Sequence, residues 1–160
     1  MVKIERTLIV DRPVAEVFAY LCEVEHGPGY IAGQQEAHQT SSGPVSIGTT
    51  FVTTSSKFPH RGTSFEFIEY EPERRLAWKA RSGARTTTVW GFQPSGNKTR
   101  ITFTRVIEAS HGLLRLPEWV VLELTNERVS RELAALSKLL DVPAREPRAS
   151  YLGRKHEKPY

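Results

Sequence analysis

The sequence of 160 residues contains one cysteine, Cys22, and two aspartates, Asp11 and Asp141. A single cysteine excludes a disulfide framework and gives no second thiolate for a structural zinc site. Both aspartates flank predicted helices, so a Ser-His-Asp triad would have to use a helix-capping residue. The five histidines include no pair four residues apart, the spacing with which one helix face binds a metal ion. We therefore expect neither a catalytic triad nor a metal site.

Nucleotide-binding motifs and long apolar segments are also missing. The chain has no Gly-x-Gly-x-x-Gly sequence and no Walker-type loop. Its longest apolar runs, such as residues 119–122, fall far short of the roughly 20 residues that cross a bilayer. The first residues alternate charged and apolar side chains and contain no signal-peptide core. We expect a cytoplasmic protein without a cofactor and without stable membrane insertion.

The net charge of +4 is unevenly distributed along the chain. Residues 142–160 carry five basic and two acidic side chains, an excess of three that leaves +1 for residues 1–141. Nucleic-acid binding requires basic side chains clustered on a folded surface, whereas this segment contains three prolines and no apolar periodicity. We interpret residues 1–141 as one domain and residues 142–160 as a mobile basic tail, and we expect no nucleic-acid partner. A specific anionic partner for the tail is the alternative interpretation.

The first part of the chain predicts one strand and two short helical segments. Apolar and polar side chains alternate over residues 2–10, as in a half-buried strand. Asp11 and Pro13 then precede apolar residues at helical spacing, which predicts a helix to about residue 23. Residues 25–30 contain two glycines and a proline, and we expect one further irregular or helical turn there.

The remainder predicts an antiparallel sheet followed by a long helix. From about residue 35 to residue 110, turn residues separate about six β-prone segments whose short connections are typical of hairpins. Residues 117–141 then carry an apolar stripe at helical spacing, over about 37 Å of helix. The stripe consists of Val121 or Leu122, Thr125, Val129, Leu133, Leu136 and Leu140. Because this stripe must cover an apolar surface, we expect an α+β fold in which a seven-stranded antiparallel sheet wraps around the C-terminal helix.

Several segments, in this order, resemble the START-domain and polyketide cyclase superfamily, also called helix-grip proteins. They are residues 9–13 with 17–21, then 47–51, 68–78 and 96–103. The resemblance covers residues 2–141. It implies a cavity between the sheet and the long helix that holds a hydrophobic small molecule and that, in some members, cyclises or dehydrates a polyketide. Members usually carry a tryptophan where this chain has Tyr30, which we place at the edge of the cavity.

Alternation of side chains along each strand predicts which of them face the cavity. If Phe67 points inward, Phe65 and Glu69 do so as well. The same reasoning selects Leu76 and Trp78, Thr88 and Trp90, and Phe103 and Arg105. Glu69 and Arg105 would then be charges among apolar side chains, and each needs a partner or access to water. They either form a structural ion pair or act on a ligand, with Glu69 as an acid or base and Arg105 polarising a carbonyl.

The candidate site combines these two charged residues with a larger set of ligand-binding candidates. The candidates are Tyr30, Phe51, Phe65, Phe67, Trp78, Thr88, Trp90, Phe103, Leu122, Thr125 and Val129. Large aromatic side chains beneath a single helix can either fill the space or shape it into a pocket. The sequence leaves open which of the two holds.

Three functions remain open at this point. The first is binding of a hydrophobic small molecule such as an aromatic polyketide, an isoprenoid or a lipid. The second is a polyketide cyclase or dehydratase that uses Glu69 and Arg105, where positioning of the chain supplies much of the catalysis. The third is a protein-interaction module that acts through the tail or an exposed sheet edge. A homodimer is compatible with all three.

Overall fold

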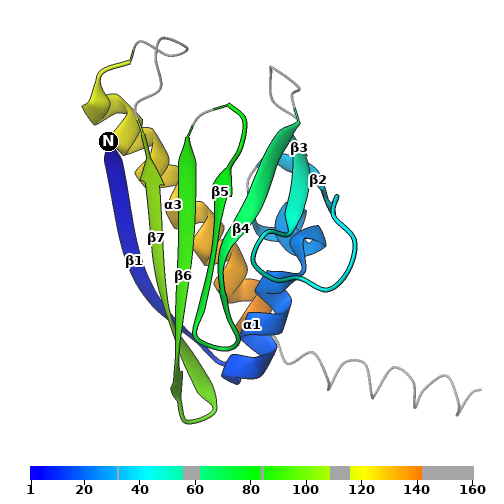
Figure 1. Ribbon diagram of the computed structural model, residues 1–160. Helices are drawn as coiled ribbons and strands as arrows, with labels where there is room; N and C mark the ends of the chain where they lie inside the picture. Colours follow the sequence, from blue (N-terminus) through cyan, green and yellow to red (C-terminus); the bar gives the residue numbers. More distant parts are fainter. Residues whose placement is uncertain (32, 56–61, 84, 109–115, 142–160) are drawn as a thin grey trace, which may run out of the picture.

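A computed structural model describes residues 1–31, 33–55, 62–83, 85–108 and 116–141 of the chain (Figure 1). Its elements, in chain order, are β1 (Val2–Val10), α1 (Val14–Cys22), the 3₁₀ helix η1 (Val24–His26), α2 (Gly27–Tyr30), β2 (Gln34–Gln39), β3 (Thr50–Ser55), β4 (Thr63–Glu71), β5 (Arg75–Ala80), β6 (Thr86–Ser95), β7 (Lys98–Ile107) and α3 (Glu118–Asp141). The predicted order of elements is confirmed.

The seven strands form one antiparallel sheet in the order β1-β7-β6-β5-β4-β3-β2. The three short helices lie between β1 and β2 in the sequence, and these two strands form opposite edges of the sheet. Figure 1 shows the sheet curving around α3, which runs along its concave face. The predicted helix-grip architecture is therefore confirmed.

Local sequence explains the strands and the turns that join them. In β1, the side chains of Val2, Ile4 and Val10 are buried and those between them are largely exposed, as the alternation predicts. The two-residue turn between β6 and β7 contains Gly96 with φ of +63°, a conformation that glycine adopts without a steric penalty. Short turns of this kind keep consecutive strands antiparallel, and the sheet is built mainly from hairpins.

The buried stripe of α3 packs against the sheet. Thr125, Val129, Leu133, Leu136 and Leu140 are buried, as predicted. Of the two alternatives at the start of the stripe, Val121 packs against the core, whereas Leu122 is 43% exposed. Val121 lies one turn before Thr125, and Leu122 is rotated by about 100° from Val121 around the helix axis. The expectation that Leu122 contacts a ligand is therefore not supported by its position.

A backbone contact fixes the far end of α3. The amide N–H of Asp11, between β1 and α1, donates a hydrogen bond of 2.8 Å to a carboxylate oxygen of Asp141, the last residue of α3. Asp141 thus contributes its carboxylate and Asp11 its backbone N–H, while the N-cap residue of α1 is Pro13, without a side-chain hydrogen bond. No helix of the described residues is long and apolar enough to span a membrane. Residues 142–160, the predicted tail, lie outside the described residues, and the domain boundary at residue 141 stays a prediction.

Candidate functional site

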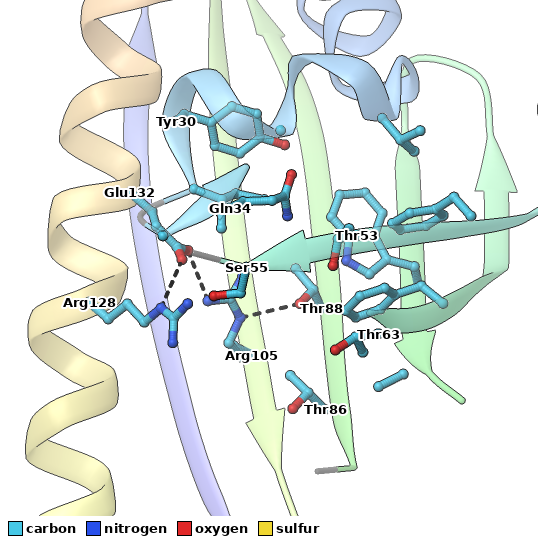
Figure 2. Close-up of a pocket in the computed structure, with 18 of the residues that line it drawn as sticks. Tyr30, Gln34, Thr53, Ser55, Thr63, Thr86, Thr88, Arg105, Arg128 and Glu132 are labelled. Carbon is cyan, nitrogen blue, oxygen red and sulfur yellow. Dashed lines mark hydrogen bonds and ion pairs between the residues drawn. The ribbon is translucent and has the colours of Figure 1, made fainter. Parts of the chain in front are cut away.

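A cavity of about 300 Å³ lies between α3, the concave face of the sheet and the short helices (Figure 2). Its walls come from six strands and all four helical segments, so elements distant in the sequence meet there. The apolar lining residues are Leu21, Val24, Ile31, Phe51, Phe65, Trp78, Ala80 and Ile107. The polar and charged ones are Tyr30, Gln34, Thr53, Thr54, Ser55, Thr63, Thr86, Thr88, Thr125, Arg105, Arg128 and Glu132. The cavity is therefore amphipathic.

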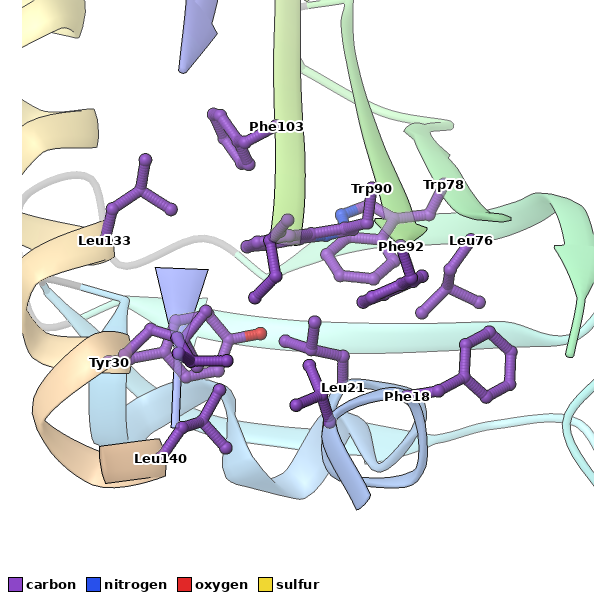
Figure 3. Close-up of a cluster of buried hydrophobic side chains, with 14 of the residues drawn as sticks. Phe18, Leu21, Tyr30, Leu76, Trp78, Trp90, Phe92, Phe103, Leu133 and Leu140 are labelled. Carbon is purple, nitrogen blue, oxygen red and sulfur yellow. The ribbon is translucent and has the colours of Figure 1, made fainter. Parts of the chain in front are cut away.

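Three aromatic side chains form the apolar wall. Phe51 and Phe65, direct partners across β3 and β4, stack with ring centroids 5.1 Å apart and an interplanar angle of 11°. Trp78 on β5 meets Phe51 edge-on at 5.8 Å. Figure 3 shows the buried cluster between the sheet and α3, which includes Trp90 and Phe103. These two rings pack at 4.8 Å and do not line the cavity, so they support the wall.

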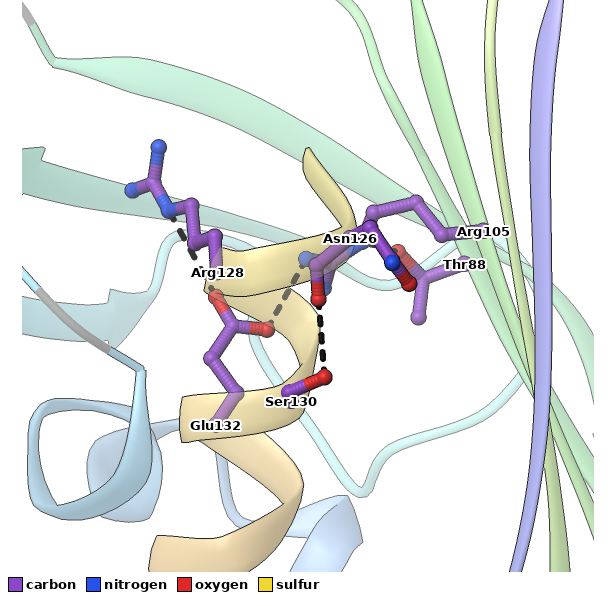
Figure 4. Close-up of polar contacts among 6 residues, drawn as sticks. All are labelled: Thr88, Arg105, Asn126, Arg128, Ser130 and Glu132. Atoms are coloured by element: carbon purple, nitrogen blue, oxygen red, sulfur yellow. Dashed lines mark hydrogen bonds and ion pairs between the residues drawn. The ribbon is translucent and has the colours of Figure 1, made fainter. Parts of the chain in front are cut away.

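A buried ion pair marks the polar side of the cavity (Figure 4). Nη1 of Arg105, on β7, donates a hydrogen bond of 2.8 Å to Oε2 of Glu132 on α3, and Nε of Arg105 donates one of 3.3 Å to Oγ1 of Thr88. The Arg105 and Glu132 side chains are only 13% and 4% exposed. Nε of Arg128, one turn earlier on α3, lies 3.6 Å from Oε1 of Glu132. The Glu132 carboxylate is thus held between two guanidinium groups.

Tyr30 brings a phenol to the same cavity from the short helix α2. Burial raises the pKa of its hydroxyl group above the ordinary value of 10.0. The nearby charge of Glu132 raises this pKa further, and Arg105 opposes the shift. At neutral pH the hydroxyl therefore carries its proton and can donate a hydrogen bond to a ligand.

Seven of the predicted site residues line the cavity. They are Tyr30, Phe51, Phe65, Trp78, Thr88, Arg105 and Thr125. Phe67, Trp90, Phe103 and Val129 are buried in the core around it, and Leu122 lies away from it. Strand alternation predicted an inward orientation for seven of these residues and for Leu76, and all eight are buried or line the cavity. Their role in ligand binding stays a prediction.

The predicted inward orientation of Glu69 is wrong. In the β4–β5 pairing, Phe67 faces Trp78 but Glu69 faces Ala77, so Ile68 is an extra residue in a β-bulge. The bulge reverses the alternation beyond Phe67, and Tyr70 becomes the inward residue that packs on Phe18. The Glu69 carboxylate, 41% exposed, instead accepts a hydrogen bond of 2.9 Å from Arg75. Glu69 therefore does not line the cavity or pair with Arg105.

Sequence reasoning missed Glu132, the actual partner of Arg105. A signal was present, because Glu132 lies seven residues after Thr125 and three after Val129 and so shares their helix face. The predicted stripe listed apolar residues and Thr125, and so did not include this charged residue. Arg128, three residues after Thr125, was left out in the same way. Gln34 carries no local pattern, and only the folded chain brings it to the cavity.

The family comparison agrees with the fold and the cavity. A model of the family described as polyketide cyclase / dehydrase and lipid transport matches residues 1–141. The chain therefore belongs to this family. The family and the fold suggest binding of a hydrophobic ligand or polyketide cyclase activity. No curated protein matches the sequence.

Solved structures show the same fold at low sequence identity. A START superfamily protein from Mycobacterium smegmatis has a TM-score of 0.69 and 13% identity, with 87% of this chain and 97% of that chain covered. The Zhui aromatase/cyclase from Streptomyces sp. R1128 has a TM-score of 0.63 and 16% identity, with 86% and 90% covered. The Aha1 dimer from Colwellia psychrerythraea has a TM-score of 0.63 and 14% identity, with 89% and 98% covered.

Proposed function

We propose that this protein binds a hydrophobic small molecule, such as an aromatic polyketide, an isoprenoid or a single-chain lipid, in the cavity beneath α3. The observation that carries the proposal is the cavity of about 300 Å³ between the aromatic wall and the Arg105–Glu132 pair. This volume is at the lower end of the range for sites that hold drug-sized ligands. A compact body with few rings or one short chain suits it better than a two-chain lipid.

The lining supports an amphipathic ligand. Phe51, Phe65 and Trp78 offer flat apolar surfaces on one side, and burial of an apolar body there contributes about 25 cal/mol for each Å² removed from water. Tyr30, Thr88 and Arg105 offer hydrogen-bonding groups on the other side. Such a combination fixes the orientation of a ligand as well as its affinity.

Native mass spectrometry of the purified protein tests the proposal directly. We expect a retained small molecule, or binding of added polycyclic aromatic ligands, and we expect Thr86→Trp to block it because Thr86 lines the cavity. Thr87→Trp is the matched control, since the neighbouring side chain points to the opposite face of β6. Loss of binding in both variants, or in neither, would contradict binding in the cavity.

Cyclase activity is a second candidate, and the position of Arg105 favours it. Its guanidinium and the Tyr30 phenol line the same cavity, which supports polarisation of a ligand carbonyl for ring closure and loss of water. The aromatase/cyclase with the same fold adds to this case. Glu69 is not available as its acid or base, because its carboxylate lies outside the cavity. Turnover of an aromatic polyketide that Arg105→Met abolishes without loss of substrate binding would establish the activity.

The protein-interaction alternative has weaker support. β1 and β2 are the edges of the sheet, but β1 carries charged side chains such as Lys3 and Glu5, which discourage pairing with another strand. Homodimerisation of this chain is left to measurement by sedimentation.

A further inference from the structure

We propose that the ligand of this cavity is a monoanion, with an apolar body and a carboxylate or similar anionic oxygen group that Arg105 binds. The inference rests on the proposed function and adds the charge of the ligand to it.

The charge of the lining is the first argument. Among the described residues that line the cavity, the charged ones are Arg105, Arg128 and Glu132, and Arg128, whose side chain is 51% exposed, carries the excess positive charge. Arg105 and Glu132 are largely removed from solvent. Buried charges are weakly screened and therefore act strongly on a bound group. An anionic ligand would add a second negative group beside the two guanidinium groups, whereas a cation would add a third positive group.

The state of Glu132 is the second argument. Its Oε2 accepts the hydrogen bond from Arg105, and its Oε1 lies 3.6 Å from Nε of Arg128. It is the one carboxylate among the described lining residues, and both of its oxygens already face a guanidinium group. A cationic ligand group would have to compete with these arginines for it. Oε1 is buried and accepts no hydrogen bond among the described residues, but a cation that reached it would meet the repulsion of both guanidinium groups.

The hydrogen-bonding capacity of Arg105 is the third argument. A guanidinium group has five N–H donors, and in the described part of the chain Arg105 uses two of them, for Glu132 and Thr88. Three donors remain for a ligand. The guanidinium lies over the Phe103 ring at 5.1 Å from its centroid, so its orientation is fixed by packing and by both hydrogen bonds. A preorganised guanidinium binds carboxylates with particular strength.

Neutral and cationic ligands are the competing possibilities. A neutral carbonyl accepts the same hydrogen bonds, but charge-assisted bonds are roughly twice as strong. A cation could lie on the rings of Phe51, Phe65 and Trp78, which are arranged as a wall. The two possibilities differ from our proposal only in the charge of the head group, and matched ligands separate them.

Isothermal titration with matched ligands tests the proposal. The probes are a carboxylic acid, a carboxamide and a primary amine on each of three bodies: 2-naphthyl, 2-anthryl and n-decyl. We expect, on the body that fits, the acid to bind about tenfold more tightly than the amide, and the amine to bind more weakly than either. Titrations at low and high ionic strength accompany each measurement, and the acid's advantage should change little with salt if the contact is buried.

Three variants connect the preference to the named residues. Arg105→Met should weaken acid binding at least tenfold and change amide binding less than threefold. The double variant R105M/E132L, which replaces the ion pair with apolar side chains and keeps the fold, should lose most of the preference for acid over amide, because the one charged lining residue it keeps among those described, Arg128, is half exposed and screened by solvent. Glu132→Gln raises the charge of the lining to +2 while it keeps a hydrogen-bond acceptor, and it should bind the acid more tightly than the native chain does.

The outcomes separate the two proposals. Equal affinity for acid and amide on every body that binds, or weaker acid binding in Glu132→Gln, would overturn the anionic ligand and leave ligand binding intact. Tighter binding of the amine than of the acid would likewise overturn the anionic ligand and leave ligand binding intact. Absence of binding by all nine probes, together with no retained molecule in native mass spectrometry, would overturn the proposed function and with it the inference.

Discussion

Arg105 on β7 and Glu132 on α3 join the sheet to the long helix through a hydrogen bond of 2.8 Å inside the molecule. The two side chains lie beside an open cavity instead of being sealed in the core. This arrangement makes the pair both a structural link between β7 and α3 and a part of the cavity lining.

Loss of one partner of this pair should be costly. Glu132→Ala leaves the Arg105 guanidinium without its carboxylate, and we expect the free energy of unfolding to fall by about 3–5 kcal/mol. Urea denaturation measures this change. Glu69→Ala is the control, because Glu69 and Arg75 form a pair that is nearly half exposed and should contribute about 0–1 kcal/mol. Equal losses in the two variants would show that the Arg105–Glu132 pair is not buried in solution.

The packing of α3 can be tested by two leucines that differ in burial. Leu136 is fully buried, whereas Leu139, three residues later, is 41% exposed. We expect Leu136→Ala to lower the free energy of unfolding by about 2–5 kcal/mol through lost burial and a new void. Leu139→Ala should cost less than about 1 kcal/mol. A larger effect at Leu139, measured by the same denaturation, would contradict the deeper burial of Leu136.

Alkaline pH should destabilise the protein through Cys22 and Tyr30. Burial, with the charge of Glu23 as a smaller cause, raises the pKa of the Cys22 thiol from 9.0 to about 12. Burial likewise raises the pKa of Tyr30 above 10.0. Both groups are neutral when protonated. Their contribution to the free energy of unfolding is therefore complete below the unfolded-state pKa, near 9 for Cys22 and near 10 for Tyr30, and is lost as the pH rises toward the folded-state pKa values.

Urea midpoints at pH 7.5, 9.5 and 10.5 measure this loss. We expect the midpoint to fall steadily above pH 9, and to fall less steeply in Cys22→Ala and Tyr30→Phe, which remove one ionising group each. An equally steep fall in the double variant C22A/Y30F would assign the pH dependence to other groups.

Substitution of Gly27 should displace the side chain of Gln34. A Cβ atom at Gly27 would collide with Oε1 of Gln34, a cavity-lining residue, whereas a Cβ at Gly29 would meet Cδ1 of Leu139 at an ordinary 3.6 Å. Both glycines are helical, so alanine itself favours the helix at each position. We expect Gly27→Ala to have a lower melting temperature than Gly29→Ala. The difference should vanish when both are made in a Gln34→Ala background, and its persistence there would point to a different cause.

Much of the fold was predictable because it depends on local patterns. Alternation over residues 2–10 and the helical stripe from Thr125 to Leu140 each identify an element and its buried face. Short turns between the later strands leave little choice but an antiparallel sheet. The helix then has only one large apolar surface to cover, so the architecture follows from the elements.

The candidate site was predictable only in part. Strand alternation placed Trp78, Thr88 and Arg105 correctly, because β5, β6 and β7 pair without interruption. It failed at Glu69, because one extra residue at Ile68 reverses the faces beyond it and no local signal marks the bulge. The role of Glu132 was visible in its helix spacing, but its partner was not.

The sequence alone determined the strands, the long helix and which side chain rows face inward, since these follow from spacings of two and 3.6 residues. Only the tertiary structure decided that Arg105 pairs with Glu132 and that Glu69 turns outward to Arg75. It also decided that a cavity of about 300 Å³ remains beneath α3. These features depend on strand register and on how large side chains pack across elements distant in the chain, and periodicity carries no information about either.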